Sequence, residues 1–124
     1  MAGTVVTTEE RLGNIHKVKF AWTSSAGGAA DATTTYHYTG EIVRAVQIPS
    51  GGGTVPSAAW DCVVNDSDGA DALVGLGANL SESAVTSKTT KDGLGAVANT
   101  QLTLAVTNAG AAKVGTTILY IKVR

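Results

Sequence analysis

Apolar and polar residues alternate along several short segments of this chain of 124 residues. The segment Ile15–Thr23, IHKVKFAWT, shows the pattern most clearly, because large aromatic and aliphatic residues occupy every second position and lysines stand between them. A period of two is that of a half-buried β-strand. We therefore expect a strand whose core-facing side carries His16, Val18, Phe20 and Trp22.

Seven further segments are β-prone or alternate in the same way, and glycine- or proline-rich stretches separate most of them. They are residues 4–8, 33–39, 41–48, 60–65, 71–76, 101–107 and 116–124. No segment carries an apolar stripe of helical length with a 3.6-residue period. The pattern predicts an all-β fold, an antiparallel β-sandwich of jelly-roll type with about seven or eight strands. The polar residues 81–95 are expected to form a long connection.

The chain is expected to form one domain, because its length is close to the commonest domain size. We assign residues 1–14 to an N-terminal arm or first strand, and residues 15–124 to the β-sandwich domain. The arm interpretation rests on a short β-prone segment that is followed by charged residues and a glycine. Such a segment could add a strand to a neighbouring subunit.

The last segment carries apolar residues on both of its faces. Leu119, Ile121 and Val123 share one face, which leaves Ile118 and Tyr120 on the other. Apolar residues on a nominally solvated face indicate a second buried surface. This second surface is buried either by a contact between subunits or by another part of the same monomer, as on a central strand. The candidate protein-interface residues are Val5, Val6, Ile118 and Tyr120.

Charge and cysteine content narrow the possible partners. Lys and Arg number 9 and Asp and Glu number 10, so the formal net charge is -1, and neither sign forms a block. We therefore expect no nucleic-acid partner and no membrane partner.

Cys62 is the single cysteine, which excludes a disulfide within the chain and a cysteine-based zinc cluster. The first residues lack the basic and apolar stretches of a leader, which favours assembly in the cytoplasm.

The stretch NDSDGAD, residues 65–71, concentrates carboxylates and invites comparison with a calcium loop. If Gly69 takes position 6 of an EF-hand loop, Val64 falls at position 1 and Gly75 at position 12, so two essential ligands are missing. Asp and Ser before a glycine are instead typical of a type I turn in a hairpin loop. We interpret the stretch as a hairpin tip, and the residues leave open whether its three aspartates, Asp66, Asp68 and Asp71, bind an ion.

Catalytic chemistry has few candidates in this sequence. His16 and His37 are the available imidazoles, and each falls in an alternating segment where packing is the expected role. Cys62 shares the core-facing side of its segment with Trp60 and Val64. No nucleophile motif or complete phosphate-binding loop is present, so we expect no cofactor, no metal and no enzymatic activity.

Several segments resemble small structural proteins of tailed bacteriophages. They are residues 60–79 (WDCVVNDSDGADALVGLGAN), 101–110 (QLTLAVTNAG) and 118–124 (ILYIKVR), together with 20–24 (FAWTS). Members of that group carry a D-V-x-L-x-D-x-D-G-x-D-V-L-x-G-x-G-A-N segment, then L-x-L-x-V-x-N-A-G and a terminal strand similar to L-Y-L-R. The matching elements are strand and hairpin signatures. The charged loop 81–95 and the last three residues depart from the pattern.

The resemblance implies a virion accessory protein, a capsid decoration or cement protein that binds across major-capsid subunits on the outer capsid surface. The implied partners are the major capsid protein and further copies of the chain, in a dimer or trimer. Two alternatives stay open. One is a head-fibre module that binds glycans of the host surface, and the other is a tail-tube or head-tail joining subunit.

Overall fold

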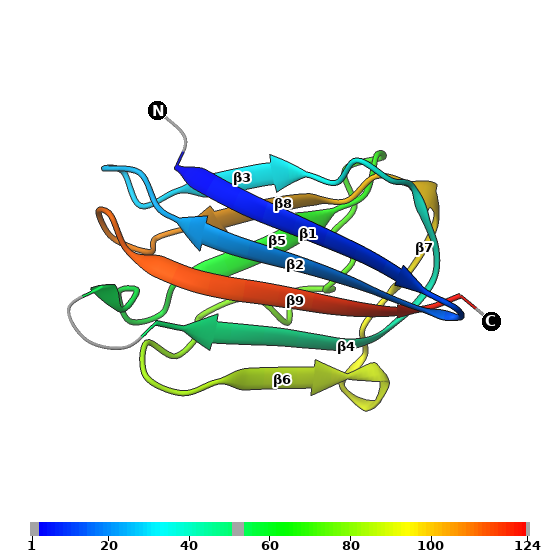
Figure 1. Cartoon of the computed structure of the whole chain (residues 1–124). Coiled ribbons are helices and arrows are strands. Elements are labelled where there is room, and N and C mark those ends of the chain that lie inside the picture. The colour runs from blue at the N-terminus through cyan, green and yellow to red at the C-terminus, as the bar shows by residue number, and fades with distance from the viewer. Residues whose placement is uncertain (1–2, 51–53, 124) are drawn as a thin grey trace.

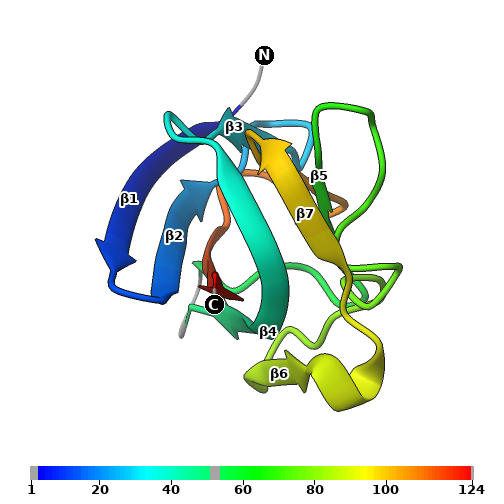
Figure 2. The same ribbon diagram turned by 90° about the vertical axis from the view of Figure 1, so that its right-hand side faces the viewer.

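The computed structural model describes residues 3–50 and 54–123, which form two antiparallel sheets packed face to face (Figure 1). The strands are β1 (Thr4–Leu12), β2 (Ile15–Thr23), β3 (Ala30–Thr33), β4 (Tyr38–Pro49), β5 (Asp61–Asn65), β6 (Thr86–Thr89), β7 (Ala96–Thr100), β8 (Thr103–Thr107) and β9 (Val114–Lys122). The larger sheet has the order β1-β2-β9-β4-β6, with β7 also paired to β4, and the smaller sheet has the order β3-β8-β5. Figure 2 shows how the larger sheet curves from β1 round to β6. The expected antiparallel β-sandwich is confirmed, with nine named strands instead of seven or eight.

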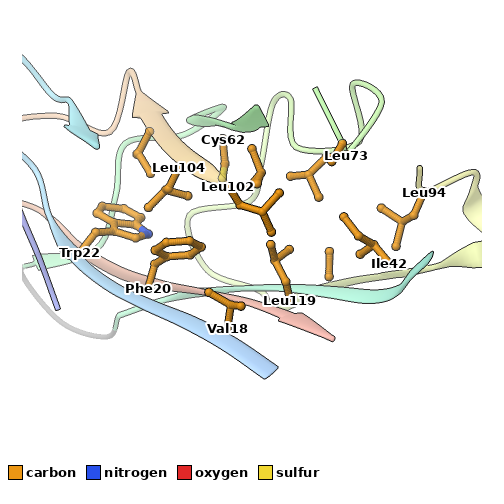
Figure 3. Close-up of a cluster of buried hydrophobic side chains, with 14 of the residues drawn as sticks. Val18, Phe20, Trp22, Ile42, Cys62, Leu73, Leu94, Leu102, Leu104 and Leu119 are labelled. Atoms are coloured by element: carbon orange, nitrogen blue, oxygen red, sulfur yellow. The ribbon is translucent and has the colours of Figure 1, made fainter. Parts of the chain in front are cut away.

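The core lies between the two sheets and is built from their inward-facing residues. On β2, Val18, Phe20 and Trp22 are fully buried, as the period of two predicts. Figure 3 shows them pointing toward Leu102 and Leu104 near the smaller sheet. These large side chains anchor the sandwich, since burial of apolar surface is the main favourable term in folding.

The two tryptophans pack against each other between the sheets at one end of the core. The rings of Trp22 and Trp60 are 5.1 Å apart between centroids and tilted by 55°. A glycine at position 115 on β9 is required there, because a Cβ atom would overlap the ring of Trp22. The small residue on the neighbouring strand therefore makes room for the largest residue of the core.

The polar segment 81–95, expected to be a connection, contains strand β6 and a short 3-10 helix, η2 (Thr90–Asp92). Thr89 caps this turn, and its backbone N–H donates to Asp92 Oδ2 at 2.8 Å. The expectation was wrong because β6 is a short edge strand with polar residues on both faces. An edge strand that packs few apolar side chains leaves no hydrophobic alternation in the sequence.

The segment 33–39, expected to be one strand, is divided between β3 and β4, with residues 34–37 outside both. Gly40 does not end a strand but lies inside β4, next to a break in the register with β7. Its φ of 143° and the nearby carbonyl oxygen of Lys122 leave no space for a Cβ atom. Glycine is needed here for a close approach between strands, which is a use that composition alone does not distinguish from a turn.

Replacing Phe20 with alanine should remove a central part of this core. We expect Phe20→Ala to lower the free energy of unfolding by about 3–5 kcal/mol, because it leaves a cavity between the sheets. Denaturant titration followed by tryptophan fluorescence would measure the loss. The matched control is Lys19→Ala, since Lys19 is the exposed neighbour on the same strand, and it should change stability by less than about 0.5 kcal/mol. Equal effects of the two substitutions would contradict this packing.

Candidate functional site

The side of the larger sheet that faces away from the core gathers most of the candidate interface residues. We name this surface the outer face. It carries Val6, Glu10, Lys17, Lys19, Glu41, Arg44, Val46, Ile118, Tyr120 and Lys122. The register sets this arrangement, because side chains opposite one another on adjacent strands point to the same face. Val6, Ile118 and Tyr120, named from the sequence, therefore lie on one surface.

Val5 lies on the opposite side of β1 from Val6. It is half-buried and packs against the hydrophobic core, whereas Val6 is 69% exposed. Successive residues of a strand point to opposite faces, so Val5 and Val6 cannot both belong to the outer face. Of the two, Val6 is the residue available to a partner.

Tyr120 lies at the centre of the outer face between two cations. Its ring centroid is 5.9 Å from Lys17 Nζ and 5.7 Å from Arg44 Cζ. Arg44 Nε also donates a hydrogen bond to Ser87 Oγ at 3.1 Å, which holds the guanidinium group beside the ring. Each cation-π contact at such a site contributes about 0.5–1 kcal/mol. The aromatic ring is thus held in place before any partner binds.

Apolar side chains border this aromatic and basic centre. Ile118 lies directly opposite Val46 on one side and Lys19 on the other. Ile118 remains half-buried although no second layer covers the outer face within the described residues. Tyr, Arg and aliphatic side chains gathered on one surface are typical of protein interfaces.

Strand β1 forms an edge of the larger sheet and is held in the sandwich along its length. It pairs with β2 from Thr4 to Leu12. Glu9, on its inner side, accepts hydrogen bonds from the backbone N–H groups of Thr35 at 2.9 Å and Tyr36 at 3.1 Å. It also accepts one from Tyr38 Oη at 2.8 Å. Burial of Tyr38, followed by the hydrogen bond to Glu9, raises the pKa of this phenol.

Arg11 completes this attachment by stacking on Tyr36, with its Cζ 4.5 Å from the ring centroid. Among the described residues, the other edge of β1 pairs with no strand. The structure therefore has β1 as the first strand of the sandwich, with one edge open and its inner side chains attached to the loop at 34–37. A partner could add a strand at that edge without displacing β1.

Two aspartates of NDSDGAD, Asp66 and Asp71, hold turns together through their carboxylates. Asp66 Oδ1 accepts hydrogen bonds from the N–H groups of Asp68 and Ala70, at 2.9 and 3.0 Å. Asp71 accepts from Val64, Leu73 and Gly75. These contacts support the turn interpretation. Residues 72–79 then continue as turns, so the expected return strand at 71–76 is wrong, because Asp71 caps the N–H groups that a strand would need.

No group of three His, Cys, Asp or Glu side chains that could hold a metal ion occurs among residues 3–50 and 54–123. Within the same ranges, no helix is long and apolar enough to cross a membrane.

Asp61, near the turns, accepts hydrogen bonds from the backbone N–H of Asn79 and from the side chain of Asn108. These bonds lower the pKa of the carboxyl group, in that order of effect.

The residues considered for catalysis lie apart in the fold. Cys62 is buried in the core, where its Sγ lies 3.8 Å from Thr117 Oγ1, and burial raises the pKa of the thiol to about 12. His16 is half-buried on β2, with its ring 5.9 Å from that of Tyr38. His37 is exposed in the loop before β4. The structure does not bring these three side chains together.

An open hollow of about 360 Å³ lies between β6 and the turns after β5. It is lined by Gly75, Leu76, Ala78, Asn79, Leu80, Ser81, Thr86 and Lys88. Ser81 Oγ already accepts hydrogen bonds from the backbone N–H groups of Ser83 and Ala84. Lys88 is thus the one ionisable side chain in a lining that mixes leucine side chains with small polar groups. The outer face has more aromatic and charged side chains than this hollow and is therefore the stronger candidate for a binding site.

Sequence reasoning missed that Lys17 and Arg44 flank Tyr120. Strict alternation does place Lys17 on the outer side of β2, and this part of the signal is present in the sequence. Its position beside Tyr120, however, depends on the pairing of β2 with β9. Arg44 also follows an irregularity in the register of β4 with β9, which simple alternation does not anticipate.

The fold and the outer face define an all-β sandwich with one exposed sheet surface that is aromatic and basic at its centre. Neither a known protein family nor a curated protein sequence matches the chain. Among solved structures, it is similar to one described as "Structural basis for the promiscuous specificity of the carbohydrate-binding modules from the beta-sandwich super family", with 18% identity and a TM-score of 0.38. The match covers 98% of this chain and 52% of that one, so the chain spans about half its length. Such a distant match carries nothing about ligands or partners.

The attachment of β1 through Glu9 can be tested by mutation. Glu9→Ala should lower the free energy of unfolding by about 1–3 kcal/mol, because three donors lose their acceptor and one of them, Tyr38 Oη, is partly buried. Urea titration would measure the change. Glu10→Ala is the matched control, since Glu10 is exposed on the outer face, and it should change stability by less than about 0.5 kcal/mol. If both variants lose the same stability, Glu9 does not hold the loop.

Proposed function

We propose that this chain is a non-catalytic structural protein of a tailed-bacteriophage virion. In this role it decorates the capsid from outside and stabilises it by binding across major-capsid subunits, as a dimer or trimer. The observation that carries the proposal is the outer face, where the exposed Val6 and the half-buried Ile118 and Tyr120 share one side of the larger sheet. The resemblance of segments 60–79, 101–110 and 118–124 to phage structural proteins supports the choice of partner.

The physical character of the outer face supports a protein partner. Tyr and Arg, both present on the outer face, are among the residues that most often dominate binding energy at interfaces. Tyr120 and Arg44 are held beside each other before binding, so little conformational entropy is lost on association. A ligand that binds only the assembled shell stabilises it by mass action.

The absence of enzymatic activity is part of the proposal. Its support is that Cys62 is buried with a raised pKa, and that neither His16 nor His37 contacts it. A thiol with a pKa of about 12 is protonated at neutral pH and is a poor nucleophile.

The glycan-binding alternative has weaker support. Sugars stack on exposed aromatic rings, and the chain has three tyrosines. Tyr38 is buried, Arg11 lies over the ring of Tyr36, and Lys17 and Arg44 lie over that of Tyr120. No tyrosine therefore offers a ring free of other side chains, and the protein partner is preferred.

The proposal predicts that the chain is present in purified virions of its source phage and raises the temperature at which they release DNA. Mass spectrometry of virions would detect the chain. Heating particles with and without it would measure release. Absence from virions would end the proposal, and an unchanged release temperature would remove the stabilising role.

A pair of variants tests the role of the outer face in this binding. Val6→Asp should weaken binding to particles about tenfold or more, because it places an extra carboxylate in the contact. Val74→Asp is the matched control, since Val74 is 59% exposed and lies on the turns after β5, whereas Val6 is 69% exposed on β1. Equal binding by the two variants would show that the particle contacts another surface.

A further inference from the structure

Charge is segregated between the two sides of the sandwich, although the net charge is only -1. Among the described residues, the outer face of the larger sheet carries four cations, Lys17, Lys19, Arg44 and Lys122, against two carboxylates, Glu10 and Glu41. The strands of the smaller sheet carry Asp31 and Asp61 and no Lys or Arg, and the turn after β5 adds Asp66, Asp68 and Asp71. The two sides of the molecule therefore have opposite electrostatic character, which the summed charge conceals.

The register shows which cations of the outer face lack an opposing charge. Glu10 lies opposite Lys17, and Glu41 lies opposite Lys122, so these two lysines each have a carboxylate on the neighbouring strand. Lys19 lies opposite Thr8 and Ile118 instead.

Arg44 lies opposite Tyr120 and Thr89. Within the described residues, no carboxylate stands opposite Lys19 or Arg44 in the register. Two positive charges are thus left uncompensated at the middle of the sheet.

The two uncompensated cations frame an apolar and aromatic centre. Lys19 adjoins Ile118, and Arg44 adjoins Tyr120, on strands that pair directly with β9. Val46, opposite Ile118, is buried, so the accessible apolar part is formed by Ile118 and the ring of Tyr120. A surface of this kind is complementary to carboxylates that flank aliphatic side chains, as on the surface of a folded protein.

We propose that the outer face binds an acidic protein surface, with carboxylates of the partner opposite Lys19 and Arg44 and apolar side chains over Ile118 and Tyr120. This inference rests on the proposed function in one respect, that the outer face is a protein-binding surface, and it adds the chemistry of the partner. It makes association depend on salt, since exposed charges at an interface mainly accelerate encounter and select the partner.

The test uses the whole chain, labelled with ¹⁵N, and three peptides of equal length as probes. One alternates glutamate with leucine, one glutamate with serine, and one lysine with leucine. We expect the glutamate–leucine peptide to bind most tightly and to shift amide signals of β2, β4 and β9. Binding should weaken about fivefold or more when salt is raised well above physiological strength. Preferred binding of the lysine–leucine peptide, or shifts confined to the smaller sheet, would overturn the proposal.

Charge-reversal variants locate the contact. Lys19→Glu and Arg44→Glu should each weaken binding of the glutamate–leucine peptide about tenfold. Lys91→Glu is the matched control, because Lys91 is exposed on the η2 turn, outside the strands of the larger sheet, and it should weaken binding much less than either outer-face variant. Retention of full affinity by both outer-face variants would overturn the proposal.

Two further measurements distinguish other possible partners of the outer face. Tighter binding of heparin or single-stranded DNA at matched charge would point to a general polyanion and overturn a protein partner. Self-association through the outer face, measured by light scattering and lost in Lys19→Glu, would show that a second copy is the occupant and would likewise overturn it.

The outcomes also distinguish this inference from the virion role. Peptide binding by a chain that is absent from virions would remove the proposed function and leave the acidic-partner inference intact. Particle binding that Lys19→Glu and Lys91→Glu share equally would leave the proposed function intact and overturn the inference.

Discussion

The antiparallel register that joins β2, β9 and β4 decides which side chains of the larger sheet enter the core. Phe20 of β2 lies opposite Thr117 of β9, and Leu119 lies opposite Ala45 of β4, with all four directed inward. A shift of β9 by one residue would turn Thr117 and Leu119 outward and direct Tyr120 into the core. The same pairing therefore produces both the hydrophobic core and the outer face.

Polar contacts reinforce this register inside the sandwich. Thr117 Oγ1 donates a hydrogen bond to Gln47 Oε1 at 2.6 Å between two buried side chains of β9 and β4. Loss of either partner would leave a buried polar group without its hydrogen bond, which costs about 1–3 kcal/mol. The bond thus favours the observed pairing over a shifted one, in which the two side chains would no longer face the interior.

Local alternation was sufficient to predict the strands that carry large apolar residues. β2, β8 and the inward and outward sides of β9 follow directly from a period of two, because each has one face in the core. β6 was missed because its residues are polar on both faces. The outer face was predicted only in part, since Ile118 and Tyr120 are recognisable on one strand, while Arg44 reaches them through pairing between residues far apart in the chain.

The charged residues of β1 have a different role in the structure from the one that the sequence suggests. In the sequence, a charged segment after a short β-prone one indicates a hinge. In the structure, Glu9 and Arg11 hold the strand to the loop at 34–37 through specific contacts. The charges that suggested mobility are the ones that attach β1 to the sandwich. This anchoring makes Val6 part of a rigid surface, which favours binding by a preformed face over binding by a detached arm.

The most direct test of this account is a cryo-EM reconstruction of the source virion at side-chain resolution. We expect density for the chain on the outer capsid surface, with the outer face against the major capsid protein. Lys19 and Arg44 should lie within about 4 Å of carboxylate oxygens of that protein. A chain that contacts the shell through the smaller sheet and its aspartates, or a shell without density for it, would contradict the account.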